Sequence, residues 1–194
     1  RNADQRMADA YGRWNQAARQ RIQRNYKPVV AAVNGPAIGG GVYLATACDL
    51  VVAVDTAFFQ LREIQAGNQS GVAYIHTIGR ARSLEMALLG RRVSAPQAES
   101  WGLINRSVPA AEFDAAVADY VDALAELPPL ALRYTKSSSN LLLDMAGFTT
   151  HLEAGSPMQR YLGLTPDGRE AKIAFNEKRK PKFTGAYPKA ADQE

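Results

Sequence analysis

The hydrophobic positions in the first quarter of the chain predict one helix and two buried strands. From Asp4 to Asn25, apolar residues recur every three or four positions, which is typical of an amphipathic helix with one face toward the core. Val29–Val33 and Leu50–Val54 are continuous apolar runs, as expected of strands that are covered on both faces. A short helix between the two runs would make them neighbouring parallel strands. The pattern therefore predicts an α/β fold.

Later segments have mostly helical spacing. Ala57–Phe59 and Arg106–Val108 are expected to be short extended pieces, so the predicted layout is a small, mostly parallel sheet followed by helices. We place a boundary between a core region, residues 1–128, and a helical C-terminal region with a tail, residues 129–194. The expected helices are Val72–Ile78, Ser83–Leu89, a segment from Ser94 to Trp101, Phe113–Leu127, Leu130–Asn140, Leu141–Ala154 and Asp167–Lys178.

A glycine-rich turn separates the two predicted strands. Asn34-Gly35-Pro36 stops the first strand, and Gly39-Gly40-Gly41 opens a short apolar segment that ends at Cys48. The N–H groups at a helix start have no intrahelical partner, and where side chains are absent an anionic ligand atom can approach them closely. The same glycines also suit a tight turn with close packing. The turn is therefore either a site that polarises a bound ligand atom or a purely structural turn.

Composition and charge narrow the class of protein. The chain has 194 residues, 46% of them hydrophobic, which suits one domain with a substantial core. A net charge of +4 is too small to indicate nucleic-acid binding. One cysteine and two histidines argue against a disulfide and against a histidine-based metal site. No apolar run reaches membrane-spanning length and no leader is evident, so we expect a cytoplasmic protein without a membrane partner. Because the chain starts at Arg1, we also expect it to be part of a longer protein.

Two kinds of chemistry fit the glycine turn. The strand, turn, helix and strand outline, with Asp55 at its end, resembles a dinucleotide-binding unit, but Leu44 stands where the third glycine of that fingerprint belongs. The alternative is an oxyanion site, in which backbone N–H groups stabilise negative charge that develops during reaction. Glu63 lies in the polar loop after the next strand and is a candidate general base, although a solvated loop carboxylate is the plainer interpretation.

The remaining candidates have weaker patterns. Basic residues of the C-terminal tail surround Phe175 and Phe183, a mixture that could hold phosphates and a purine ring, although most such runs are solvated surface. Cys48, His76 and His151 have no partners at recognisable spacing, so we interpret them as structural.

Several blocks of the sequence, in order, resemble the crotonase (enoyl-CoA hydratase/isomerase) superfamily. They are AAVNGPAIGGGVYLATACDLVVA, AFFQLRE, the segment from Gly90 to Pro109 and FNEKRKPKF. The resemblance implies a spiral of ββα units and an enzyme that acts on a coenzyme A thioester. No covalently bound cofactor is implied, because coenzyme A is part of the substrate. It also implies a homotrimer or homohexamer in which C-terminal helices pack across subunits.

The resemblance assigns roles by position. Gly40 falls where an N–H group donates to the thioester oxygen, and Glu63 falls on the second catalytic glutamate of the family. Phe175 and Lys178 fall where the C-terminal helix approaches the adenine and phosphates of coenzyme A. Hydratases of the family carry a first glutamate at the position of Tyr43, which makes Tyr43 the residue that decides the reaction.

Departures from the family pattern leave the reaction open. Hydration is assigned to two carboxylates, whereas members with a single glutamate shift a double bond, which fits Glu63 better. Tyr43, whose ordinary pKa is near 10, can donate a hydrogen bond but is a poor base. Arg62 replaces a common proline, the loop from Glu63 to Gly79 is short, and the opening strands with the second oxyanion donor are not in the sequence. A catalytically silent scaffold, a hydrolase and a decarboxylase remain alternatives.

Overall fold

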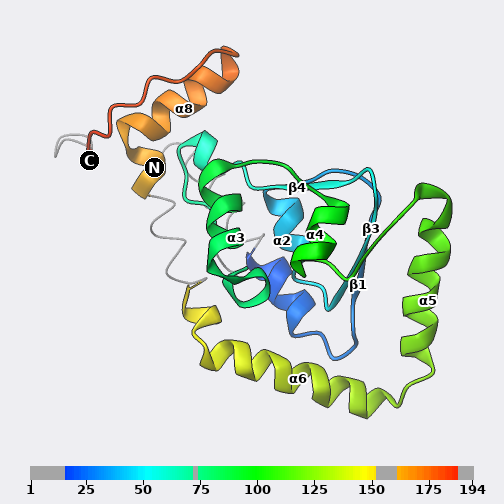
Figure 1. The fold of residues 1–194 in the computed structure, drawn as a ribbon. Helices are drawn as coiled ribbons and strands as arrows, with labels where there is room; N and C mark the ends of the chain where they lie inside the picture. The colour runs from blue at the N-terminus through cyan, green and yellow to red at the C-terminus, as the bar shows by residue number, and fades with distance from the viewer. Residues whose placement is uncertain (1–15, 72–73, 152–160, 188–194) are drawn as a thin grey trace.

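The computed structural model describes residues 16–71, 74–151 and 161–187 (Figure 1). Its elements follow the predicted order of strands first and helices later. The strands are β1 (Val30–Val33), β2 (Ala37–Ile38), β3 (Leu50–Val54), β4 (Phe58–Gln60), β5 (Val93–Ser94) and β6 (Arg106–Val108). The helices are α2 (Gly40–Ala45), α3 (Ile75–Leu89), α4 (Ala95–Trp101), α5 (Phe113–Ala125), α6 (Pro129–Met145) and α8 (Pro166–Asn176), with 3₁₀ turns η1 (Ile64–Ala66) and η2 (Ala110–Glu112).

The strands form two sheets, which corrects the expectation of one. The predicted pair β1 and β3 is parallel, with Val30 opposite Leu50, and β6 extends this sheet on the other side of β3. β4 instead joins β2 in parallel and β5 in antiparallel orientation in a second sheet. The second sheet was missed because β2 and β5 have two residues each, too few to show a periodic pattern.

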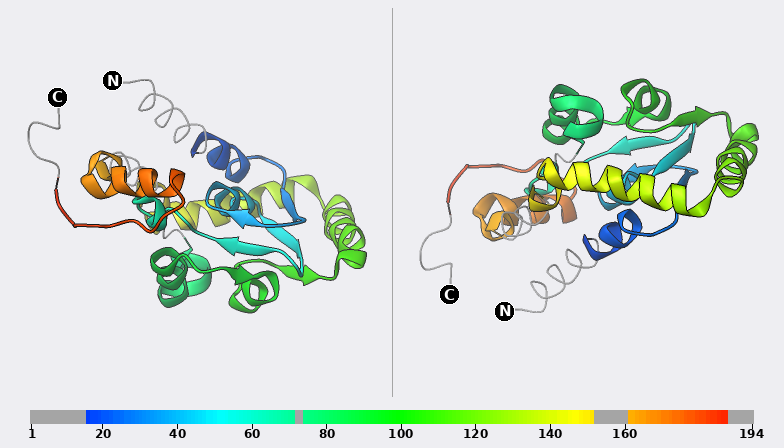
Figure 2. Two further views of the ribbon diagram at one scale, coloured as in Figure 1. Left: turned by 90° about the horizontal axis from the view of Figure 1, so that it is seen from above. Right: turned by 90° about the horizontal axis from the view of Figure 1, so that it is seen from below.

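Helices cover the strands on both sides. In the left view of Figure 2, α2 and the helical residues 16–23 lie on one side of the strands, and α3 and α4 lie on the other. The main core combines strand residues such as Val51 and Phe59 with helix residues such as Val42 and Met86, all at most 4% exposed. A smaller cluster joins β3 and β6 to α5 through Val52, Val108 and Ala116. The elements on both sides of the glycine turn, β2 and α2, are therefore anchored in the main core.

Several predicted helix boundaries are confirmed by their caps. The side-chain oxygen of Ser94 accepts a hydrogen bond from Gln97 N at the start of α4, and that of Thr165 accepts one from Gly168 N at the start of α8. The two helices expected on either side of Gly79 form one element, α3, that is kinked there, since Gly79 has a φ of 74°. The predicted first helix is present over residues 16–23, and its residues 4–15 lie outside the described residues.

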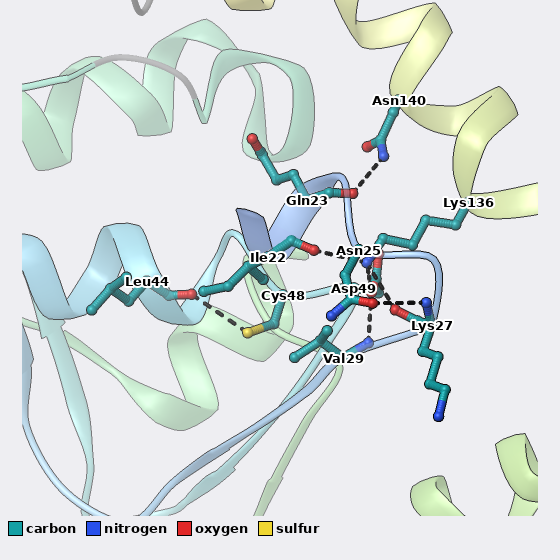
Figure 3. A network of polar contacts seen from close by, with 10 residues as sticks. All are labelled: Ile22, Gln23, Asn25, Lys27, Val29, Leu44, Cys48, Asp49, Lys136 and Asn140. Carbon is teal, nitrogen blue, oxygen red and sulfur yellow. Dashed lines mark hydrogen bonds and ion pairs between the residues drawn. The ribbon is translucent and has the colours of Figure 1, made fainter. Parts of the chain in front are cut away.

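Lys136 is the single buried residue of α6, and it ties this helix to the start of the chain (Figure 3). Its ammonium group donates to Ile22 O at 3.0 Å and Lys27 O at 3.2 Å, and it lies 2.6 Å from Asp49 Oδ2. One turn later on α6, Asn140 Nδ2 donates to Gln23 O at 2.7 Å. Two side chains of α6 thus satisfy carbonyl groups at the C-terminal end of helix 16–23, where a positive charge is also favourable.

Asp49 links the same cluster to the first sheet. Its Oδ2 accepts a hydrogen bond from Val29 N at 2.7 Å, immediately before β1. The predicted boundary at residues 128 and 129 falls between α5 and α6. Among the described residues, no helix is long and apolar enough to cross a membrane.

Candidate active site

The pairing of β2 with β4 brings the glycine turn next to Glu63. Ile38 lies opposite Gln60 in the parallel register, and Gly39 N continues the ladder by donating to Gln60 O at 2.8 Å. The carboxyl ends of parallel strands lie at the same edge of a sheet, so the chain leaving β4 passes the start of α2. Glu63 Oε1 would be only 3.0 Å from a Cβ built on Gly39.

The glycine turn leaves N–H groups free at the start of α2. Gly39 is the N-cap residue, with a φ of 51° and a ψ of −113°, a conformation that favours glycine. Its carbonyl accepts hydrogen bonds from Val42 N and Tyr43 N. The N–H groups of Gly40 and Gly41 donate to no acceptor among the described residues. These two unpaired donors directly follow Gly39, the residue that the Glu63 carboxylate approaches.

The Glu63 carboxylate is half-buried in an environment that favours its neutral form. Burial raises the pKa of Glu63, and nearby donors, among them its own backbone N–H and the Ser70 hydroxyl, only partly oppose this rise. Its Oε2 atom is buried and has no hydrogen-bond partner of good geometry in the described part of the chain. A carboxylate with one oxygen kept free and a raised pKa is suited to accept a proton.

Tyr43 lies on α2 beside this carboxylate. Its side chain is 8% exposed, and its hydroxyl oxygen accepts a hydrogen bond from Gly71 N at 2.8 Å. Burial, and then the negative charge of Glu63, raise the pKa of Tyr43 to about 12. The Tyr43 ring is stacked on that of Tyr74 with 6.0 Å between the centroids. Tyr43 is therefore a fixed, protonated phenol and not a base at neutral pH.

We expect Gly39→Ala to lower kcat by about 10- to 100-fold, because the new methyl group would displace the Glu63 carboxylate and small misplacements at a reacting centre are costly. The strained φ should also lower the free energy of unfolding by about 1–2 kcal/mol. Gly35→Ala is the matched control, because a Cβ there would meet nothing within 4 Å. Steady-state kinetics and thermal unfolding of both variants provide the measurement. Equal effects of the two substitutions would contradict the contact between Gly39 and Glu63.

Arg62 and the residues after Glu63 form an ordered turn that packs against α8. Arg62 Nε donates to Gln65 Oε1 at 3.0 Å, so this residue stabilises the turn that follows Glu63. At the end of η1, a Cβ on Gly67 would lie 2.8 Å from the Cα atom of Gly168 in α8. The close approach of two glycines fixes the C-terminal helix against the loop that carries Glu63.

Phe175 lies in the last turn of α8 and Lys178 just after its end, and no described hydrogen bond or ring contact joins them to Glu63, Gly40 or Tyr43. Phe175 is 72% exposed, and Lys178 has a φ of 54°, which is unusual for a residue with a side chain. The tail after them folds back along α8, where Glu170 binds the Arg179 guanidinium and Lys182 N. Part of the predicted basic cluster is therefore paired within the chain.

The other candidate residues make local contacts. Cys48 Sγ lies 3.5 Å from Leu44 O, and burial raises the pKa of its thiol, which disfavours the reactive thiolate. The ring of His76 has an edge contact with Phe148. Across the described ranges, no group of three His, Cys, Asp or Glu residues could hold a metal ion.

Sequence reasoning missed three residues that complete the site, namely Arg19, Ser70 and Tyr74. The Arg19 guanidinium lies over the Tyr43 ring, 4.8 Å from its centroid, and Tyr74 is 4% exposed behind that ring. Ser70 is 6% exposed near the Glu63 carboxylate. The position of Ser70 in a polar loop was a weak signal, whereas the contact of helix 16–23 with α2 has no signal in residue spacing.

Comparisons with known proteins place these features in context. Residues 2–186 match the family model described as "Enoyl-CoA hydratase/isomerase". The chain is 37% identical over 169 residues to a Mycobacterium tuberculosis H37Rv protein named "Probable enoyl-CoA hydratase EchA12", an alignment that covers 84% of this chain and 59% of that protein. It is 34% identical to the (E)-benzylidenesuccinyl-CoA hydratase of Thauera aromatica, with 83% of this chain and 64% of that protein covered.

A solved structure has the same fold. The crystal structure of an enoyl-CoA hydratase from Mycobacterium avium subsp. paratuberculosis K-10 superposes with a TM-score of 0.80 and 36% sequence identity. The match covers 86% of this chain and 69% of that chain. The present chain spans less than two thirds of the length of the M. tuberculosis and Thauera relatives.

Proposed function

Because the chain belongs to the enoyl-CoA hydratase/isomerase family and has its crotonase-like α/β fold, we propose that it binds an acyl-CoA thioester and moves a proton on the acyl chain through an enolate. Glu63 is the proposed base, and the Gly40 N–H group is one donor to the thioester oxygen. The observation that carries this proposal is the half-buried Glu63 carboxylate, whose Oε2 atom has no partner and whose Oε1 atom approaches Gly39, directly before two N–H groups that donate to no described acceptor.

The proposed reaction starts with removal of a proton from the carbon next to the thioester carbonyl or conjugated with it. Glu63 takes this proton, and the electron pair left behind delocalises onto the thioester oxygen. The Gly40 N–H group stabilises the negative charge on that oxygen. Glu63 then returns the proton to another carbon of the same system, which shifts the double bond and restores the carboxylate. One carboxylate suffices for both transfers.

Tyr43 favours isomerisation over hydration. Addition of water would need a second base to activate the water, and Tyr43 occupies the position at which hydratases of the family carry a glutamate. With its pKa raised to about 12 and its oxygen engaged by Gly71 N, the phenol is not available as that base. Its proton can instead be donated toward Glu63, which orients the carboxylate. Catalytically silent binding, thioester hydrolysis and decarboxylation are the competing functions that the product assay below distinguishes.

The pH dependence of kcat/KM should report Glu63. Only the ionised carboxylate accepts a proton, and a raised pKa keeps the carboxyl protonated to higher pH, so the acid limb should have its midpoint above 4.5, the ordinary value. No alkaline limb from Tyr43 is expected below about pH 10, since its pKa is about 12. Rates measured from pH 4 to 10 test both statements. An acid limb at or below the ordinary value would contradict the role of Glu63.

Phe175 and Lys178 are the proposed contacts for the coenzyme A part of the substrate. Phe175 offers an exposed aromatic face for the adenine ring, and Lys178 offers a cation for the phosphates. No cofactor other than this part of the substrate is needed for the proposed reaction.

We also expect a homotrimer or homohexamer, because α6 exposes a stripe of apolar side chains that water does not favour. The stripe consists of Leu130, Tyr134, Leu141, Leu142 and Met145, each at least 61% exposed. Sedimentation equilibrium should give the mass of three or six chains. Replacement of Leu141 by glutamate should lower that mass, and a monomeric wild-type protein would contradict the expectation.

The product of the reaction tests the proposed function. The purified protein is incubated with a panel of enoyl-CoA and β-keto-acyl-CoA thioesters, and the products are analysed by mass spectrometry and chromatography. Isomerisation gives a product of unchanged mass and altered retention time. Gain of one water indicates hydration, release of free coenzyme A indicates hydrolysis, and loss of carbon dioxide indicates decarboxylation. Binding of the thioesters with no product from any of them would favour the silent scaffold.

A further inference from the structure

Arg19 projects from helix 16–23 to the aromatic wall of the candidate active site. Its guanidinium lies 4.8 Å from the centroid of the Tyr43 ring, and its positive charge also acts on the hydroxyl of Tyr74. The helix that carries it is held at its C-terminal end by Lys136 and Asn140 (Figure 3). The cation therefore has a fixed position one side chain away from the group that contacts Glu63.

The hydrogen-bonding capacity of Arg19 is not used within the described residues. Its Nε atom is buried and has no hydrogen-bond partner there. The charges of Arg19 and Glu63 act on the Tyr43 hydroxyl in opposite senses, the first lowering and the second raising its pKa. A buried donor without a partner is costly, and a guanidinium has a planar fork of N–H groups that matches the two oxygens of a carboxylate. Because Nε is enclosed, a bound anion would contact the two terminal nitrogen atoms of this half-buried arginine, which make no hydrogen bond among the described residues.

Resting on the proposed function, we infer that the acyl group of the substrate carries a free carboxylate that binds Arg19, so that the protein acts on dicarboxylic acyl-CoA thioesters. Such a substrate contains two kinds of anion, the carboxylate of the acyl group and the phosphates of coenzyme A, and the position of Arg19 favours the carboxylate as its ligand. Arg19 lies over Tyr43, the residue whose hydroxyl interacts with Glu63, whereas the proposed phosphate contact, Lys178, lies after the end of α8. Arg19 is thus a specificity-determining residue for the acyl end of the ligand.

Binding of unreactive saturated thioesters measures this specificity without turnover. Isothermal titration calorimetry compares succinyl-, glutaryl- and adipoyl-CoA with the monomethyl ester of each, which has nearly the same shape but no charge. At one or more chain lengths, the free acid should bind about 10- to 100-fold more tightly than its ester. The same preference should persist for pantetheine thioesters, which lack the nucleotide phosphates.

Substitutions assign the preference to Arg19. Arg19→Met should remove the preference for the free acid, Arg19→Lys should retain part of it, and Arg21→Met, which changes an exposed arginine of the same helix, should leave it unchanged. Thermal unfolding shows whether each variant is folded, and the wild-type ratio together with Arg19→Lys suffices if Arg19→Met does not fold. Equal binding of acids and esters by the wild type would overturn this inference and leave the proposed function standing. Failure of every thioester to bind would overturn both.

Discussion

Glu63→Gln is expected to lower kcat by about 10²- to 10⁴-fold, because glutamine has the shape of glutamate but cannot accept the proton. The affinity for an acyl-CoA thioester should stay within about threefold of the wild-type value, since the amide keeps the packing of the carboxylate. Removing a half-buried carboxylate should not destabilise the fold, because burial already disfavours its charge. Single-turnover kinetics and calorimetric binding measure the two quantities separately.

Glu85→Gln is the control for this substitution. Glu85 is exposed on α3, so its replacement should change neither kcat nor affinity. If the Glu63 variant kept its turnover within about threefold of the wild type, a group other than Glu63 would have to move the proton. Loss of binding together with turnover would instead assign Glu63 to substrate positioning.

Lys136→Met should lower the free energy of unfolding by about 3 kcal/mol. The Lys136 side chain is 6% exposed and that of Asp49 is 25% exposed, so the variant would leave a largely buried carboxylate without its cation. It would also leave Lys27 O without a donor, and Ile22 O with only the 3.3 Å hydrogen bond from Asn25 N. For a chain of this size, the loss corresponds to a decrease in Tm of about 6–12 °C.

Lys172→Met is the matched control, since Lys172 is exposed on α8 and its replacement should change Tm by no more than about 2 °C. A combined Lys136→Met and Asp49→Asn variant should recover part of the lost stability, because the unpaired charge is then removed. An unchanged Tm for Lys136→Met would mean that the ion pair seen in Figure 3 does not hold helix 16–23 against α6.

The sequence predicted the parts of the fold that local patterns determine. Leu50–Val54 is a strand over the predicted residues, and its parallel partner β1 follows from two apolar runs joined by a short helix. Ser94 and Thr165 were recognised as caps because the residues that follow them have fixed spacing. The second sheet was not predicted, because β2 and β5 are held by the ladder with β4 and not by propensity of their own.

The candidate site likewise contains residues that the sequence predicted and residues that it did not. Gly40 and Glu63 could be predicted because each follows a strand, and strand ends are brought together by the parallel pairing of β2 with β4. The Tyr43 hydroxyl accepts a hydrogen bond from Gly71 N. This contact depends on how the loop after Glu63 folds, and no residue pattern specifies that fold. Arg19 and Lys136 depend on contacts between helices that are far apart in the chain, and an amphipathic stripe does not show which side chain will reach across.

The interaction between Tyr43 and Glu63 distinguishes this candidate site from one with two carboxylates. A second carboxylate at position 43 would lie close to Glu63 and raise the energy of its ionised form. A phenol at this position adds no charge and can donate to the carboxylate. In the proposed mechanism, a phenol at this position leaves Glu63 as the single base and supplies no group that activates water.

Exchange of substrate hydrogen with solvent tests the central claim most directly. The wild-type protein and Glu63→Gln are incubated in D₂O with an acyl-CoA thioester that binds, and deuterium in the acyl chain is followed by mass spectrometry. The proposed mechanism predicts deuterium at the carbon next to the thioester carbonyl or conjugated with it with the wild type, and none above background with Glu63→Gln. Equal deuterium incorporation by both proteins, or none by the wild type, would contradict proton transfer by Glu63.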